Sequence, residues 1–143
     1  MAMSTQEQLR AIYEKWHAGF SRNDLPAIMA LYAENAVIET PTVLAVYPDA
    51  TEGVLRGRAA IEALFARILQ NISGEFRELH RSGLFLASGN LLMWEYPRLT
   101  PSGDQLDLVE SMDIEDGLIV YHRVYWGWRG YKSLQEAAAK KPY

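Results

Sequence analysis

The chain has 143 residues, no cysteine and three histidines, His17, His80 and His122. Its 14 basic and 18 acidic side chains give a formal net charge of −4 and are mixed along the sequence, which argues against nucleic acid as a partner. The lack of cysteine excludes disulfide frameworks, thiolate metal sites and cysteine nucleophiles. The length predicts one domain over 1–143, and the short apolar stretches and polar N-terminus predict a cytoplasmic protein without membrane contact.

The first half of the sequence has helical periodicity. Ser4 and Glu7 have the spacing of a capping box, and the apolar residues that follow recur at helical spacing. Asp24 has the character of a second helix cap. We expect three helices and one short strand, in chain order at residues 4–21, 24–34, 36–40 (the strand) and 58–70. The long connection 42–57 is of the kind that often forms a lid.

The apolar period changes to two near residue 74, which indicates strands. Four antiparallel strands are expected at 75–87, 91–100, 105–115 and 118–128, joined by short turns, followed by a short helix at 131–140. Asp116-Gly117 is the strongest of the turn signals. The order predicts an α+β fold, in which a curved, mostly antiparallel sheet wraps around the N-terminal helices and leaves a cone-shaped pocket.

Two titratable residues stand on apolar faces of the last two strands. Glu110 is the single carboxylate on one face of 105–115, and His122 is the single titratable residue on one face of 118–128. A two-residue turn would pair Glu110 with Arg123 and leave His122 one position away, whereas a one-residue bulge would bring Glu110 and His122 side by side. A glutamate beside a histidine in an apolar pocket is typical of an acid/base pair. The alternative is a satisfied core hydrogen bond, or a pair that reaches solvent at the mouth.

Other polar candidates are less clearly placed by the pattern. Hydrophobicity favours Trp94 and Tyr96 toward the interior and Glu95 toward solvent. The strand around His80 is too polar to assign a face. His17 lies at the edge of the apolar stripe of the first helix, as a boundary residue or a ligand contact. The histidines and glutamates lack metal-ligand spacing, so we expect no metal site, and there is no phosphate-binding glycine loop or serine-hydrolase elbow.

Three stretches, residues 23–37, 55–61 and 116–126, resemble the SnoaL-like branch of the nuclear-transport-factor-two-like superfamily. The resemblance implies a cone-shaped pocket, a homodimer packed through the outer face of the sheet, and no cofactor. The ketosteroid-isomerase pattern of this superfamily has a tyrosine, an aspartate base and an aspartic acid, which fall here on Trp16, Thr40 and Glu110. Only the carboxyl of Glu110 is retained.

Two other patterns of the superfamily involve strands of the expected sheet. The limonene-epoxide-hydrolase pattern falls on Met93, Glu95 and Val124, of which only Glu95 matches, and this match turns Glu95 inward. An acid/base histidine of the cyclases and dehalogenase-like members resembles His80. No single mechanism of the superfamily is complete in this sequence.

We therefore expect a cofactor-independent enzyme that transfers protons on a small apolar or aromatic molecule, as an isomerase, cyclase, dehydratase or hydrolase. Glu110 and His122 would form the acid/base pair, with His80 and Glu95 assisting. The residues expected to contact the substrate are Tyr13, Trp16, His17, Met112, Val124 and Trp126. The alternative is a non-catalytic ligand-binding or dimeric accessory domain that uses the same pocket.

Overall fold

The computed structural model describes residues 3–71, 85–96, 99–100, 103–104 and 107–139. Five helices are described: α1 (Gln6–Ser21), α2 (Leu25–Met29), α3 (Thr42–Val46), α4 (Arg58–Asn71) and α6 (Trp128–Ala139). The strands of the described ranges are β1 (Tyr32–Glu39), β2 (Val54–Arg56), β3 (Leu86–Ser88), β4 (Leu91–Glu95), β5 (Leu99–Thr100), β6 (Gly103–Asp104), β7 (Leu108–Glu115) and β8 (Leu118–Trp126).

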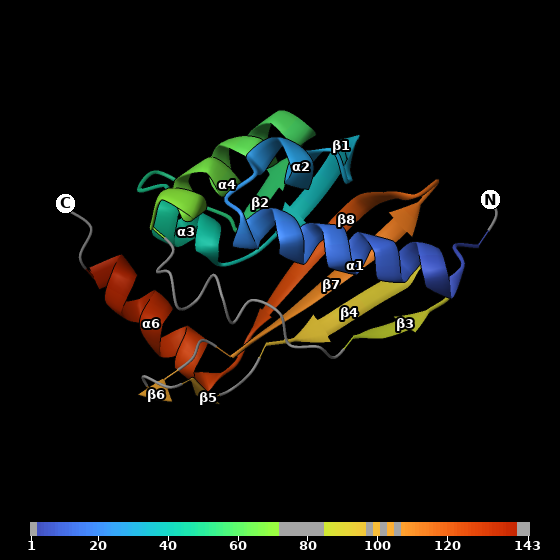
Figure 1. The fold of residues 1–143 in the computed structure, drawn as a ribbon. Coiled ribbons are helices and arrows are strands. Elements are labelled where there is room, and N and C mark those ends of the chain that lie inside the picture. The colour runs from blue at the N-terminus through green and yellow to red at the C-terminus, as the bar shows by residue number, and fades with distance from the viewer. Residues whose placement is uncertain (1–2, 72–84, 97–98, 101–102, 105–106, 140–143) are drawn as a thin grey trace.

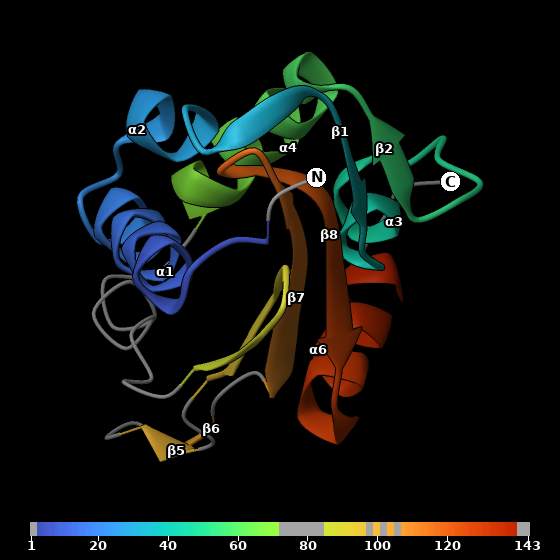
Figure 2. The same cartoon turned by 90° about the vertical axis from the view of Figure 1, so that its right-hand side faces the viewer.

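Six of these strands form one curved sheet. Their order is β2-β1-β8-β7-β4-β3, and every neighbouring pair is antiparallel except β1 and β8, which are parallel. Figure 2 shows the sheet bending from β4 through β7 and β8 to β1, with α1 and α4 on its concave side. The expected α+β fold with a curved, mostly antiparallel sheet around N-terminal helices is confirmed.

The core lies between the concave face of the sheet and helices α1, α2 and α4. Helix α4 reaches far into it, because the ring of Phe65 lies 5.4 Å from Phe20, 5.6 Å from Tyr32 and 6.5 Å from His122, measured between ring centroids. The largest fully buried side chains come from both layers: Leu9, Trp16, Ile28, Met29, Tyr32, Ile38, Ile61, Leu64, Leu92, Trp94, Tyr96 and Met112.

The start of α1 differs by one residue from the expected capping box. Thr5 is the helix cap: its side chain accepts the N–H of Gln8 at 3.1 Å, and the Gln8 side chain accepts the N–H of Thr5 at 2.7 Å. The N–H of Ser4 instead donates to the side chain of Asn90 at 2.7 Å, which ties the N-terminal segment to the β3–β4 turn. The expected pair of Ser4 and Glu7 is therefore wrong by one position.

The second helix is shorter and the strand after it longer than the periodicity predicts. Helix α2 ends at Met29, and β1 begins at Tyr32, within the segment expected to be helical. Residues 31–33 are all buried and Tyr32 pairs with Ile119 of β8, so tertiary pairing overrides the local helical pattern. The connection 42–57 carries α3 and β2, which pairs with β1.

The hairpin of β7 and β8 has the turn that the sequence predicts. Asp116 and Gly117 both have positive φ angles, 51° and 75°, as a type I′ turn requires, and Glu115 pairs with Leu118. The register then shifts between Asp113 and Ile114, so that Val120 is an extra residue of β8. A one-residue bulge is thus present in this hairpin.

Helices α3 and α6 lie at the end of the sheet away from this turn (Figure 1) and contact each other. Helix α6 is capped from outside its own sequence, since the Asp107 carboxylate accepts the N–H of Gly130 at 2.7 Å. The helix begins at Trp128, three residues earlier than expected, and β8 ends at Trp126. None of the helices in the described ranges has the length and apolar character of a membrane-spanning segment.

Candidate functional site

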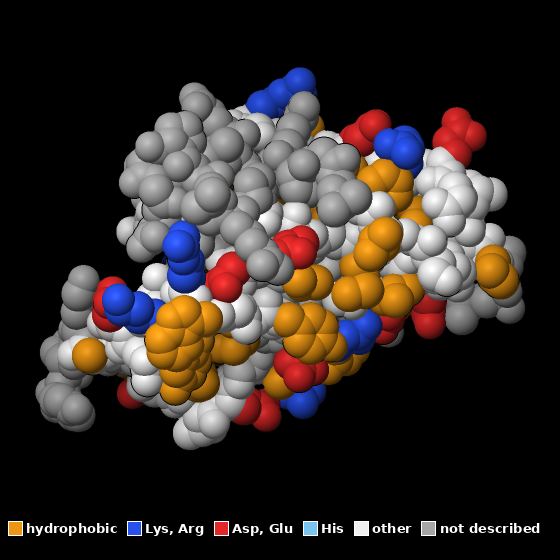
Figure 3. All heavy atoms as spheres, turned by 90° about the horizontal axis from the view of Figure 1, so that it is seen from below, with side chains coloured by type: hydrophobic (Ala, Val, Ile, Leu, Met, Phe, Trp, Pro, Cys, Tyr) orange, Lys and Arg blue, Asp and Glu red, His pale blue; other side chains and the backbone are white. Residues whose placement is uncertain are grey.

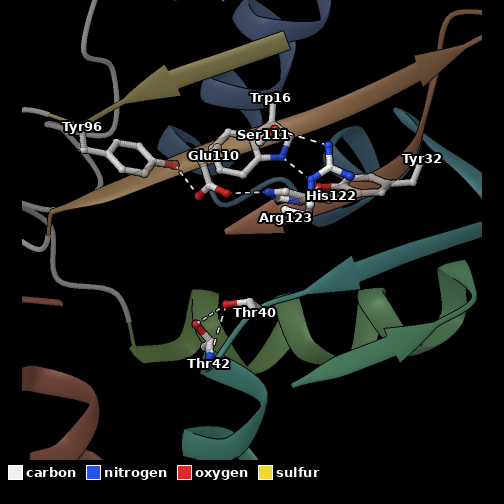
Figure 4. Close-up of polar contacts among 9 residues, drawn as sticks. All are labelled: Trp16, Tyr32, Thr40, Thr42, Tyr96, Glu110, Ser111, His122 and Arg123. Carbon is white, nitrogen blue, oxygen red and sulfur yellow. Dashed lines mark hydrogen bonds and ion pairs between the residues drawn. The ribbon is translucent and has the colours of Figure 1, made fainter. Parts of the chain in front are cut away.

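Five buried side chains form a hydrogen-bonded line across the interior, and we call them the buried polar cluster (Figure 4). Trp16 comes from α1, Tyr32 from β1, His122 from β8 and Glu110 from β7, and Tyr96 directly follows β4. The backbone N–H of Tyr96 donates to the carbonyl of Leu108 at 3.2 Å, which keeps Tyr96 beside β7. The cluster therefore joins α1 to four neighbouring strands of the sheet.

The hydrogen bonds run from one end of the cluster to the other. Nε1 of Trp16 donates to the Tyr32 hydroxyl at 3.1 Å, and this hydroxyl lies 2.8 Å from Nδ1 of His122. Nε2 of His122 lies 2.5 Å from Oε2 of Glu110. The Tyr96 hydroxyl donates to Oε1 of Glu110 at 2.8 Å. Both ring nitrogens of the histidine and both oxygens of the carboxyl group are thus engaged.

The bulge at Val120 is what places Glu110 and His122 on one face. Beyond the bulge Glu110 pairs with Val124, and His122 pairs with Met112, so Glu110 and His122 are diagonal neighbours. Without the extra residue, the register at the turn would continue and put His122 on the opposite face. Of the two registers considered from the sequence, the bulged one is confirmed.

The cluster is nearly closed to solvent. His122 is 1% exposed and Glu110 6% exposed, which makes the carboxyl the most accessible member of the five. A buried carboxylate needs hydrogen-bond donors to replace water, and here Tyr96 and His122 take that place. Burial also raises the pKa of Tyr32 and of Tyr96 well above the ordinary value of 10.0, and the charge of Glu110 acts in the same direction. Both phenols therefore stay protonated and can donate.

A carboxylate held this way can accept a proton from a bound molecule, because each of its oxygens retains lone-pair capacity beyond the one hydrogen bond it accepts. General acid/base groups of this kind contribute about 10²–10⁴-fold in rate. The neighbouring donors would stabilise the carboxylate after it returns the proton. The arrangement is suited to proton transfer in a site that excludes water.

The sequence pattern gives no site role to Tyr32, and it turns Tyr96 inward without giving it a role. Periodicity places Tyr32 at the end of the second predicted helix, where its face cannot be related to the sheet. The available signal was chemical: a tyrosine in an apolar segment needs a partner for its hydroxyl. Two such residues near a buried glutamate and histidine indicate a network.

The expected substrate-contact residues, of which Trp16 belongs to the cluster itself, lie at different depths. Tyr13, Trp16 and Met112 are buried, at 7%, 2% and 0% exposure. Val124 and Trp126 follow His122 on the same face of β8 and are half-buried. The interior face thus becomes more accessible along β8 from His122 toward α6.

Glu95 does not join the cluster. It pairs with Val109, and the burial of β4 alternates so that Leu92 and Trp94 face the interior and Glu95 faces the other side of the sheet. The inward orientation implied by the hydrolase resemblance is therefore wrong, and the orientation that hydrophobicity favours is confirmed. His80 lies outside the described residues.

His17 is fully buried, so its expected position at the edge of the helix stripe is wrong. Its Nδ1 lies 2.8 Å from the carbonyl of Tyr13, one helical turn back, and its ring lies 4.8 Å from that of Trp94. The side chain packs between α1 and β4. In the described parts of the chain, no group of three or more histidine and acidic side chains has a metal-binding arrangement.

Thr40, which takes the place of the aspartate base in the isomerase pattern, lies across from the cluster on the segment after β1 (Figure 4). It is 2% exposed. Its hydroxyl donates to Oγ1 of Thr42 at 3.0 Å and accepts the N–H of Thr42 at 3.2 Å. A threonine hydroxyl is no base at neutral pH, so of the three positions of that pattern only Glu110, in the place of the aspartic acid, carries a carboxyl group.

The curved, mostly antiparallel sheet with helices on its concave side is the cone-shaped α+β fold of the nuclear-transport-factor-two-like class. Within this class the chain belongs to the SnoaL-like domain family, whose model matches residues 13–122. No curated protein matches the chain in sequence.

Solved structures show the same fold at low sequence identity. A SnoaL-like protein of unknown function from Burkholderia thailandensis is 21% identical with a TM-score of 0.68, over 87% of this chain and 99% of that one. A putative ketosteroid isomerase from Kribbella flavida is 22% identical with a TM-score of 0.57, over 85% and 79%. A de novo designed protein with a curved β-sheet is 12% identical with a TM-score of 0.66, over 94% and 97%. These likenesses establish the fold alone.

Proposed function

We propose that this protein is a cofactor-independent enzyme that transfers a proton on a small apolar or aromatic substrate, as an isomerase, cyclase, dehydratase or hydrolase. The observation that carries the proposal is the hydrogen bond between the carboxyl of Glu110 and the imidazole of His122 inside an apolar core, with Tyr96 on the second carboxyl oxygen. A carboxyl group hydrogen-bonded to an imidazole can serve in general acid/base catalysis when a substrate reaches it. The putative ketosteroid isomerase among the similar structures agrees with proton-transfer chemistry.

In this proposal Glu110 faces the substrate, because it is the most exposed member of the cluster. The substrate would lie along Val124 and Trp126, the half-buried residues on the same face of β8. Trp16 and Met112 would contact its apolar part. Glu95, on the other face of the sheet, has no part in this reaction, and His80 keeps the assisting role that the family resemblance suggests.

The test measures proton abstraction directly. Apolar aryl ketones such as 1-tetralone are incubated with the protein in D2O, and deuterium uptake beside the carbonyl is followed by mass spectrometry. We expect Glu110→Gln to slow the exchange by about 10²–10⁴-fold, because the amide cannot take the proton. Asp113→Asn is the matched control. Asp113 is on the same strand, but its carboxylate is on the outer face, where it accepts a hydrogen bond from the Arg123 guanidinium at 2.8 Å.

The alternative proposal is a ligand-binding domain that uses the same interior without catalysis. It is favoured by the loss of the base at Thr40. Saturable quenching of tryptophan fluorescence by the ketone, without deuterium uptake in the wild-type protein, would support this alternative and count against an enzyme.

We also propose that the protein is a homodimer. The outer face of the sheet carries Tyr125, which is 55% exposed, and Leu86, which is 67% exposed, beside half-buried residues of β4 and β7. Figure 3 shows hydrophobic side chains gathered among charged ones in the view from below. A second copy would cover the apolar part of this face.

A further inference from the structure

Tyr32 is the one member of the buried polar cluster that touches His122 from the side away from Glu110. It is 1% exposed, lies on β1, and its hydroxyl contacts Nδ1 of His122 at 2.8 Å. No role for it follows from the proton-transfer proposal alone, since it does not reach the carboxyl group. Its hydrogen-bonding partners nevertheless determine where the proton of His122 resides.

The donor and acceptor of each hydrogen bond in the buried polar cluster follow from the two ends of the cluster, Trp16 and Tyr96. The indole N–H of Trp16 can only donate, so the Tyr32 oxygen accepts there, at 3.1 Å. The hydroxyl hydrogen of Tyr32 then needs an acceptor, and Nδ1 of His122 is the acceptor that the described residues provide. Nδ1 must be unprotonated to accept it, and the single proton of the neutral imidazole is then on Nε2.

The hydrogen bonds at the Tyr96 end of the cluster agree with this assignment of donors and acceptors. Nε2–H of His122 points at Oε2 of Glu110, and the hydroxyl of Tyr96 points at Oε1. A carboxylate accepts both hydrogen bonds. With a proton on Nδ1 instead, the Tyr32 oxygen would face two donors, and its own hydroxyl hydrogen would have no acceptor among the described residues. A buried donor of this kind costs about 1–3 kcal/mol.

We propose that Tyr32, held by Trp16, is a positioning residue that fixes the imidazole of His122 with its proton on Nε2, so that Glu110 is the proton acceptor of the site. His122 and Tyr96 then both act as hydrogen-bond donors to the carboxylate. A proton taken from a substrate carbon would reside on Glu110 and not on the imidazole. The catalytic meaning of this assignment rests on the proposed function, but the position of the proton does not.

The experiment is a long-range 1H–15N correlation spectrum of the uniformly 15N-labelled protein at near-neutral pH, which distinguishes protonated from unprotonated ring nitrogens. The chain has three histidines, so His122 is assigned by the signals that disappear in His122→Gln. We expect wild-type His122 to show a protonated Nε2 and an unprotonated Nδ1. We expect Tyr32→Phe to keep Nε2 protonated, because Glu110 still accepts its hydrogen, and to move the 15N signal of Nδ1 to higher frequency, because Nδ1 no longer accepts a hydrogen bond.

Tyr121→Phe is the matched control. It removes a hydroxyl from the residue next to His122, but that hydroxyl donates to Glu39 at 2.8 Å, away from the cluster, so the His122 pattern should be unchanged. If Tyr32→Phe does not fold, Trp16→Phe takes its place and should also change the Nδ1 signal, because the Tyr32 hydroxyl loses the donor that orients it. A wild-type His122 protonated on Nδ1, or a folded Tyr32→Phe with the wild-type Nδ1 signal, would overturn the assignment. Failure of the deuterium exchange would leave this result intact and would contradict only the proposed function.

Discussion

At the scale of single residues, the buried pair of Glu110 and His122 is the most consequential feature of the chain. Removing the histidine leaves a carboxylate that is 6% exposed with one donor fewer. Removing one partner of a buried hydrogen bond leaves the other partner short of a donor, and loss of the imidazole ring also leaves a cavity in the core.

We therefore expect His122→Ala to lower the free energy of unfolding by about 3 kcal/mol, measured by urea denaturation at neutral pH. Arg123→Ala is the matched control on the outer face of the same strand. The hydrogen bonds of Arg123 to Asp113 raise the pKa of its guanidinium above the ordinary value, but this pair is part-exposed, so its loss should amount to about 1 kcal/mol or less. Equal losses in the two variants would contradict a stabilising role of the buried hydrogen bond between His122 and Glu110.

The sequence predicted the two central residues of the site but not their partners. Glu110 and His122 were found because each is the single titratable residue on an apolar strand face. The role of Tyr32 could not be predicted, because it depends on the pairing of β1 with β8, and local periodicity says nothing about which distant strands pair. Glu95 shows the converse: hydrophobicity placed it correctly, whereas transfer of a family position did not.

At the scale of the elements, the junction of β8 and α6 depends on one carboxylate. Asp107 precedes β7, accepts the N–H of Gly130 in the first turn of α6, and has its backbone carbonyl 2.6 Å from the N–H of Gly127. Burial alone would raise the pKa of Asp107. The hydrogen bonds from the backbone N–H groups of Gly130, of Asp107 itself and of Arg129 outweigh that effect and lower the pKa below the ordinary value of 3.8.

Asp107→Ala should lower the free energy of unfolding by about 1 kcal/mol at neutral pH, as for the loss of a helix cap. Because the pKa of Asp107 is lower in the folded state, its stabilisation is complete above pH 3.8 and is lost as the pH falls through the folded value. Thermal denaturation of both proteins across this range should show the difference shrinking. Glu136→Ala, which removes an exposed carboxylate of α6, should show no such convergence.

The elements themselves were predicted with uneven success, for identifiable reasons. The β7–β8 hairpin could be predicted because Asp-Gly favours the positive φ angles of a tight hairpin turn. The boundary between α2 and β1 was placed too late, since residues 31–33 are buried whether they are helical or extended and so give no local signal. The expected strand over 75–87 is described only at its end, in β3.

At the scale of the whole molecule, the fold is a general shape that does not specify a reaction. A designed protein reaches a TM-score of 0.66 with 12% identity, so a curved sheet backed by helices can be encoded by an unrelated sequence. What distinguishes this chain is its buried polar cluster. The class of fold could be predicted from the order of helices and strands, whereas the cluster required the register of four strands.

The proposed homodimer is tested at this scale. Tyr125→Glu should place a charge on the outer face and convert the protein to monomers, because a stable interface needs about 1,200–2,000 Å² of buried surface and tolerates no unpaired charge there. Light scattering after size-exclusion chromatography measures the mass. Leu44→Glu, at a 36% exposed residue of α3, is the control and should leave the dimer intact. A wild-type protein of monomer mass would contradict the proposal.

The extra residue at Val120 changes the parity of strand β8. Before it the odd-numbered Ile119 faces the interior, and after it the even-numbered His122 and Val124 do. The effect resembles a frameshift, since one inserted residue reassigns every later side chain to the other environment. A comparison that runs through this strand without a gap would therefore match the interior histidine to an exterior position in any relative that lacks the bulge, and the shared site would go unseen.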